Sequence, residues 1–219
     1  MSNNRYSNYH GSHIKLLKNL SFMKPKYFLG NIILLFSITI LCGCGGNSTQ
    51  VNNEESKLTE KQEKLIAEGW YIPKTDISGE LPSEYGVKPK YGQQDNYFDI
   101  EIGKGCDVAI KIVDATTDKC IRYVFVPENT SVNIQMIPQG KYYLKLAYGK
   151  DWMEYVKDDG SIIGKFTKNV SYDKSVDIFD FGKKNADSIV NFLLNINVVD
   201  NVLENNFNTV EISEEEFLK

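Results

Sequence analysis

The chain has 219 residues, of which 42% are hydrophobic, 25% charged and 12% aromatic; this is the composition of an ordinary globular protein and argues against wholesale disorder. Residues 1–43 contain five basic residues and no acidic one, which leaves 20 basic against 29 acidic residues and a formal charge of −9 for residues 44–219. Such a balance disfavours nucleic acid as a partner and predicts no electrostatic attraction to an anionic membrane surface.

The first 43 residues have the pattern of an export signal. Lys24 and Lys26 precede an uncharged apolar stretch that ends in small residues, which is the usual order of such signals. The apolar run at 32–42 has 11 residues and would form a helix of about 16 Å, too short for a hydrocarbon core of about 30 Å. We therefore expect an export signal at 1–43, with translation starting at Met23 because residues 1–22 add nothing to it.

The signal ends in Leu41-Cys42-Gly43-Cys44, which resembles the lipobox of bacterial lipoproteins. The resemblance implies cleavage before Cys44 and attachment of a diacylglyceryl group to its sulfur, with fatty acids such as palmitate. Because Gly45 rather than Asp follows, the resemblance also implies sorting to the outer membrane, on either face. Two alternatives stay open: lipid attachment at Cys42, and an uncleaved or ordinary secretory signal.

The segment after Cys44 is predicted to begin with a tether. Residues 44–57 contain one isolated valine among polar residues and cannot bury enough apolar area to order themselves. A short helix should follow, because Thr59 and Gln62 have the spacing of a capping box and Gly69 is placed to end it. Three prolines and three glycines then predict an irregular but packed lead-in, so we group 58–95 as helix and lead-in.

Short β-type runs separated by turn residues predict strands from residue 96 onward. The runs 107–113 and 120–126 flank a turn at 114–118, and Tyr142 to Tyr148 alternate in the way expected of a strand with one buried face. The sequence 158–160, Asp-Asp-Gly, predicts another hairpin.

The clearest alternation lies near the end of the chain, from Val190 to Val198. Asp200 and Asn201 would turn this strand back into a strand at 202–212. Strands therefore recur about every 8–12 residues, which predicts a mainly β protein with an antiparallel β-sandwich at 96–212. An acidic tail is expected at 213–219.

The turn at 137–144, Ile-Pro-Gln-Gly-Lys-Tyr-Tyr-Leu, resembles the Pro, Gly and Tyr turn of carboxypeptidase regulatory-like domains, which are prealbumin-like sandwiches. The resemblance covers about 40 residues, roughly 107–148. It implies a β-sandwich module for binding or support without catalytic residues. The tyrosine ring is expected to cover the end of the core.

Histidine chemistry is excluded from the exported part. His10 and His13 are the only histidines and both precede the expected cleavage site, which removes Ser-His-Asp and Cys-His catalysis and His-ligated metals. A carboxylate-dependent hydrolase remains an alternative, although most such acids are turn formers or solvated charges. The candidates are Asp95, Asp99, Glu101, Asp107, Asp151, Glu154, Asp158 and Asp159. We expect no catalytic site, no metal site and no cofactor.

Cys106 and Cys120 are predicted to be unpaired and largely buried. If 114–118 is a simple hairpin, Cys120 faces Val113, about seven residues or roughly 23 Å along the strand from Cys106. A disulfide between them would contradict this register.

Aromatic residues supply the binding hypothesis, because rings in loops or at strand ends can stack on sugar faces or anchor a protein. The alternative is that they close the ends of the sandwich. The candidates are Trp70, Tyr71, Tyr85, Tyr91, Tyr97, Tyr143, Trp152 and Tyr155, with Trp70, Trp152 and Tyr155 the foremost. The sequence thus predicts a lipid-anchored envelope lipoprotein with a non-catalytic binding or assembly-support domain; a glycan-binding accessory lipoprotein is the alternative.

Overall fold

The computed structural model describes residues 58–74, 76–182, 189–199 and 202–219, so the expected signal, Cys44 and the tether lie outside the described residues. The described residues belong to one compact unit. It opens with helix α1 (Glu60–Ala67), whose N-terminus has the predicted capping box between Thr59 and Gln62. Within the described part of the chain, no helix has the length and apolar character needed to cross a bilayer.

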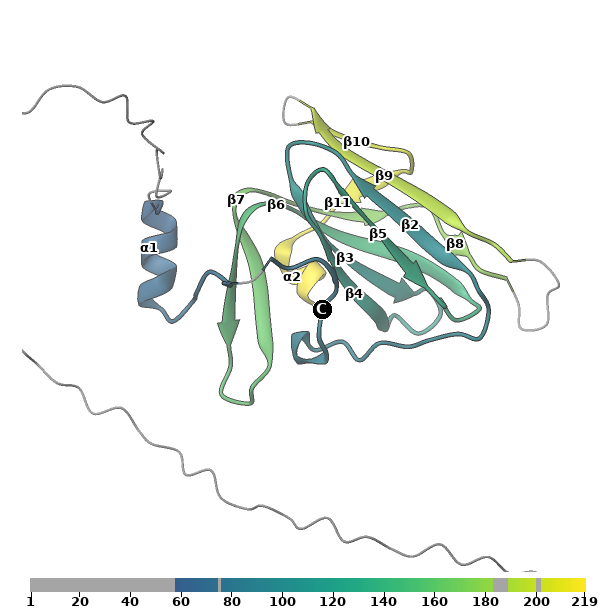
Figure 1. Cartoon of the computed structure of the whole chain (residues 1–219), viewed down its shortest axis with the longest axis horizontal. Coiled ribbons are helices and arrows are strands. Elements are labelled where there is room, and N and C mark those ends of the chain that lie inside the picture. The colour runs from purple at the N-terminus through teal and green to yellow at the C-terminus, as the bar shows by residue number, and fades with distance from the viewer. Residues whose placement is uncertain (1–57, 75, 183–188, 200–201) are drawn as a thin grey trace, which may run out of the picture. The chain divides into compact units, whose positions relative to one another are not determined.

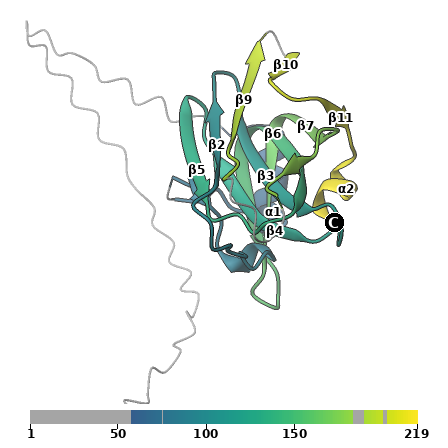
Figure 2. The same cartoon turned by 90° about the vertical axis from the view of Figure 1, so that its right-hand side faces the viewer.

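The fold is mainly β and consists of two sheets that face each other (Figures 1 and 2). The seven-stranded sheet has β8 (Phe179–Asp180) paired to β6 and otherwise runs in the order β1 (Gly79–Glu80), β4 (Cys120–Val126), β3 (Asp107–Asp114), β6 (Lys141–Val156), β7 (Ile162–Ser175) and β11 (Thr209–Glu211). The four-stranded sheet runs in the order β10 (Val202–Asn205), β9 (Phe192–Val199), β2 (Tyr97–Ile102) and β5 (Thr130–Gln135).

One strand pair departs from the expected antiparallel arrangement. β2 and β9 are parallel, with Phe98 opposite Phe192 and Ile102 opposite Ile196, whereas the other named pairs are antiparallel. The reason is topological: β9 follows β8 of the other sheet and reaches β2 by a crossover, not by a hairpin.

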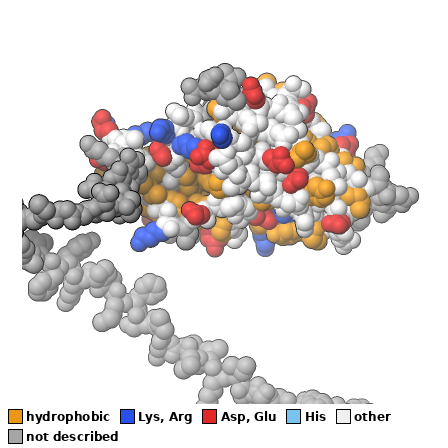
Figure 3. All heavy atoms as spheres, turned by 45° about the horizontal axis from the view of Figure 1, so that its top comes forward, with side chains coloured by type: hydrophobic (Ala, Val, Ile, Leu, Met, Phe, Trp, Pro, Cys, Tyr) orange, Lys and Arg blue, Asp and Glu red, His pale blue; other side chains and the backbone are white. Residues whose placement is uncertain are grey.

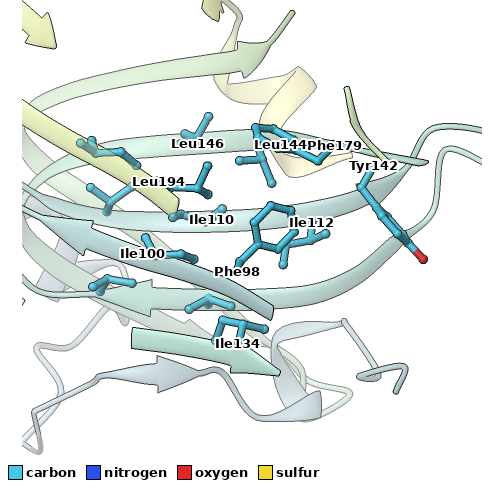
Figure 4. Close-up of a cluster of buried hydrophobic side chains, with 14 of the residues drawn as sticks. Phe98, Ile100, Ile110, Ile112, Ile134, Tyr142, Leu144, Leu146, Phe179 and Leu194 are labelled. Atoms are coloured by element: carbon cyan, nitrogen blue, oxygen red, sulfur yellow. The ribbon is translucent and has the colours of Figure 1, made fainter. Parts of the chain in front are cut away.

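The main core fills the space between the sheets. Alternate side chains of the facing strands are buried there, because successive residues of a strand point to opposite faces (Figure 4). This set includes Phe98, Ile100, Ile110, Ile112, Leu144, Leu146, Leu194 and Ile196.

The predicted one-sided burial of Tyr142 to Tyr148 is wrong, because this stretch of β6 is buried on both faces. A second core lies on the outer face of the large sheet, where Ala147 packs with Leu81 and Val87 of the lead-in and with Phe217 of the C-terminal helix. The covering segments lie far from β6 in sequence, so the alternation within the strand could not predict that its outer face is buried.

The expected acidic tail at 213–219 forms helix α2 (Glu214–Leu218), with Ser213 as its N-cap. Phe217 is 1% exposed. The ammonium groups of Lys111 and Lys145, which lie opposite each other on β3 and β6, donate to the carbonyls of Phe217 (2.8 Å) and Glu216 (2.7 Å). The lysines thereby satisfy carbonyls at the end of the helix, where a positive charge is favourable.

The predicted return strand at 202–212 is divided. β10 pairs with β9, with Val202 opposite Val199 as the two-residue connection requires, although residues 200–201 themselves lie outside the described residues. The chain then bends and β11 joins β7 in the other sheet.

The predicted hairpins at 114–118 and 158–160 are confirmed. Cys120 lies opposite Val113, and the Asp114 carboxylate accepts the amides of Thr116 and Thr117 within the turn. The turn at 158–160 joins β6 to β7. Cys106 is buried and Cys120 half-buried, both are free thiols, and burial raises the pKa of each to about 11.

Tyr142 lies in the predicted turn at 137–144, at the start of β6. Its hydroxyl donates to the carbonyl of Pro138 at 2.8 Å, and its ring packs edge-on against Phe181 with centroids 6.0 Å apart. The ring therefore covers an end of the core, as expected.

Candidate functional site

A buried carboxylate, that of Glu154 on β6, organises the outer face of the large sheet. Glu154 is 5% exposed and accepts hydrogen bonds from the hydroxyls of Tyr71 (2.7 Å) and Tyr85 and from the indole nitrogen of Trp152 (3.3 Å). Backbone hydrogen bonds in both directions also join Tyr71 to Glu154. These contacts fasten the lead-in to β6 and satisfy a charge that would otherwise be costly to bury.

The two tyrosines remain donors at neutral pH. The hydrogen bond to Glu154, followed by burial, raises the pKa of Tyr71 to about 12, and burial, followed by the same carboxylate, raises the pKa of Tyr85 well above its usual range. Each Glu154 oxygen therefore accepts a hydrogen bond from a tyrosine hydroxyl that stays protonated at neutral pH. Because Glu154 is buried and accepts three hydrogen bonds from the chain itself, this arrangement suits a structural anchor.

Trp152, a foremost candidate from the sequence, is mainly a core residue. It is 7% exposed, and its ring packs edge-on against Phe125 and Phe166 with centroid distances of 5.1 and 4.8 Å. Gly164 makes room for it, since a Cβ there would lie 2.0 Å from the indole.

Trp152 and Phe125 nevertheless line a surface groove of about 490 Å³, which is the candidate binding site. Asp76, Asp107 and Thr130 supply polar groups to the same groove. The pairing of an aromatic wall with carboxylate and hydroxyl groups is suited to a sugar, whose ring has apolar faces and hydroxyls at its edge.

Lys150 neutralises part of the negative charge beside the groove. Its ammonium group lies 3.1 Å from Asp107 and 3.0 Å from Glu128, and the pKa of the Glu128 carboxyl is lowered by the hydrogen bond from Lys150 and by the amide of Gly105. Asp107 also accepts the amide of Glu128. The Asp107 carboxylate is therefore fixed in place beside the groove.

Trp70 and Tyr155, the other two foremost candidates, are brought together. Both rings are half-buried, their centroids are 5.6 Å apart, and the Lys165 ammonium lies 4.3 Å from the Trp70 centroid. Gly69 allows this contact, because a Cβ there would lie 3.3 Å from the Tyr155 ring. The pair closes the junction between the end of α1 and β6, and it contributes no residue to the groove at Trp152.

The remaining aromatic candidates serve packing more than binding. Tyr143 is buried and donates to Asp118, and Tyr97 is half-buried on β2. Tyr91 is exposed, with the Arg122 guanidinium over its ring. Tyr143 supports the packing alternative, whereas Tyr97 lies on the four-stranded sheet and Tyr91 stays exposed.

The carboxylates proposed for a hydrolase have separate partners in the described part of the chain. Asp107 pairs with Lys150, Glu154 binds tyrosines, and Asp159 accepts the Ser161 amide in its turn. Among the described residues, no group of three or more His, Cys, Asp or Glu side chains could hold a metal ion.

Sequence reasoning missed the role of Glu154 and the groove residues Asp76 and Phe125. Glu154 did have a detectable signal, because it is a charged residue at a predicted strand position between Trp152 and Tyr155. Its tyrosine partners lie 83 and 69 residues away, so nothing local identified them.

The chain was compared with models of protein families, with curated proteins and with solved structures, and none of these comparisons found a match. The geometry of the sandwich and its groove is therefore the basis for a functional proposal.

Proposed function

We propose that this protein is a lipid-anchored lipoprotein of the bacterial cell envelope whose β-sandwich binds a partner or supports an assembly without catalysis. The observation that carries the proposal is the sequence Leu41-Cys42-Gly43-Cys44 at the end of a short apolar run. One acyl chain holds a protein only marginally, and each further buried methylene adds about 0.8 kcal/mol, so two or three chains make a durable anchor.

The described domain is compatible with this attachment. Thirteen residues separate Cys44 from Leu58, the first described residue, and such a segment spans at most about 45 Å when extended. Acidic side chains are scattered over the face in Figure 3, so the lipid, not charge, would supply the attraction to the bilayer. Gly45 after the cysteine supports the outer membrane as the location.

The proposal of a non-catalytic domain is supported by Glu154, the most buried carboxylate among the described residues. Glu154 has both oxygens occupied by donors of the chain itself. An envelope protein or another macromolecule with a neutral or basic contact surface fits the acidic balance of the exported part.

Replacing the lipid-bearing residue tests the anchor. Cys44→Ala should abolish incorporation of a labelled palmitate analogue and move the protein from the detergent phase to the aqueous phase in a detergent partition assay, because no thiol is left at the acceptor position. Cys42→Ala is the matched control and should keep both properties. Incorporation that persists in Cys44→Ala and disappears in Cys42→Ala would move the site to Cys42, and persistence in both would contradict the lipobox interpretation.

Glycan binding is a second candidate because Trp152 and Phe125 line a groove with carboxylate and hydroxyl groups beside them. The chain has two tryptophans, so Trp70→Phe leaves Trp152 as the only one. Soluble glucan and N-acetylglucosamine oligosaccharides should then shift Trp152 fluorescence in the variant as in the parent protein. A shift in the parent alone would assign the effect to Trp70, and no shift in either would rule against this function for these sugars.

A further inference from the structure

A second cavity, separate from the groove at Trp152, lies where residues of both sheets meet. Its volume is about 350 Å³, at the lower end of the roughly 300–1,000 Å³ typical of small-molecule sites. Cys106, Tyr148 of β6, Asp173 of β7 and Val198 of β9 contribute to its lining. None of these residues has a part in the proposed anchor.

Tyr148 brings an unsatisfied polar group to this cavity. The residue is 3% exposed, and its hydroxyl has no hydrogen-bond partner of acceptable geometry. Asn205 of β10 lies close enough to lower the pKa of Tyr148, but its side-chain oxygen is also buried without a partner. Burial, followed by the charge of Asp173, raises the pKa of Tyr148 well above its usual range, so the hydroxyl keeps its proton. Buried groups of this kind normally have a partner, and their exceptions call for an explanation.

Asp173 brings a negative charge. It is 8% exposed, and the Thr209 hydroxyl donates to one of its oxygens at 2.7 Å. Among the ion pairs of the described residues, none includes Asp173. A buried carboxylate without a cation is costly, and a bound cation would reduce that cost.

We propose that this cavity binds a small organic molecule carrying a primary ammonium group. The ammonium would donate to the Asp173 carboxylate and to the oxygen of Tyr148, and a short alkyl body would contact Val198 and the Cys106 thiol.

A metal ion fits the cavity less well. Calcium and magnesium take six or more oxygen ligands, and the cavity provides a single carboxylate. A primary ammonium has three N–H donors, and the two oxygens of Asp173 together with the oxygen of Tyr148 can accept them.

Titration calorimetry with four probes of similar size tests the proposal on the protein as its host produces it. n-Butylammonium should bind saturably, whereas n-butanol, which lacks the charge, and n-butyrate, which reverses it, should bind at least about tenfold more weakly or not at all. Tetramethylammonium has the charge but no N–H donor and should also bind more weakly. Equal binding of all four, or no binding of n-butylammonium, would overturn the proposal.

Variants locate the site. Asp173→Asn should weaken n-butylammonium binding about tenfold or more, while Asp158→Asn, which removes a carboxylate from an exposed turn, should leave it unchanged. Tyr148→Phe keeps the packing and should weaken binding while raising the unfolding midpoint of the free protein, because it removes a buried hydroxyl without a partner. Unchanged binding in both cavity variants, or a lower midpoint for Tyr148→Phe, would contradict the inference.

Discussion

Tyr142 illustrates how a single hydroxyl links the chemistry of the chain to its stability. It is 2% exposed and donates to the Pro138 carbonyl. Burial, followed by the charge of Asp114, raises its pKa from 10.0 to about 12. Between these two values the folded protein keeps a proton that the unfolded chain has lost, so the free energy of unfolding falls as the pH rises.

Tyr142→Phe should therefore have opposite effects at neutral and alkaline pH. At pH 7 it should lower the free energy of unfolding by about 1 kcal/mol, because the hydrogen bond to Pro138 is lost. Between about pH 10 and 12 the decline in stability should be shallower than in the parent by up to about 1.4 kcal/mol per pH unit. Urea unfolding across this range measures both effects. Tyr91→Phe, at an exposed ring, is the control; an unchanged alkaline slope in Tyr142→Phe would contradict the account.

Glu154 shows how the burial of a charged residue depends on its neighbours. A charged residue in a strand is ordinarily a sign of a solvated face, and here it is a buried acceptor for three donors. The charge is compatible with burial only because the lead-in places Tyr71 and Tyr85 against it.

Among the elements, α2 depends on one aromatic side chain. The Phe217 ring packs against Tyr172 with centroids 5.5 Å apart, and the Lys111 ammonium lies 4.9 Å from its centroid. Two buried lysines hold the carbonyls of the helix end, so loss of the helix would also leave their charges without these acceptors.

Phe217→Ala should lower the free energy of unfolding by about 3–5 kcal/mol, the usual cost of removing a buried aromatic ring. Leu218→Ala, one residue further along and 46% exposed, should cost less than about 1 kcal/mol. Chemical denaturation measures both values. Similar small losses in the two variants would mean that α2 contributes little to the fold.

The sequence predicted local pairing well, because turn residues determine it. The hairpin at 114–118 could be read from Asp114 and its two threonines, which correctly placed Cys120 opposite Val113. The parallel pairing of β2 with β9 could not, since alternation in Phe98–Ile102 and in Phe192–Ile196 is the same in either direction.

Burial of side chains by segments distant in the sequence was the other feature that could not be predicted. Lys145 interrupts the apolar side chains of β6 in a way typical of a solvent-facing position, yet its ammonium is buried and donates a hydrogen bond to the backbone carbonyl of Glu216, 71 residues away. The candidate rings were recognisable as a class, but whether Trp152 lies in the core or on the surface depends on Phe125 and Phe166.

For the whole molecule, the sandwich has a core between its sheets and another on the outer face of the larger sheet. The second core uses the lead-in and α2 as its cover, so the folded unit extends beyond the predicted sandwich at both ends. A domain of this kind can remain stably folded while a lipid on an upstream cysteine holds it at a bilayer, as we propose.

The most direct test of the lipoprotein proposal is mass spectrometry of the N-terminal peptide of the protein isolated from its native membrane. The account predicts a peptide that begins at Cys44 and carries a diacylglyceryl group with its fatty acids. An unmodified peptide that runs continuously from Gly43 through Cys44 to Gly45 would contradict it.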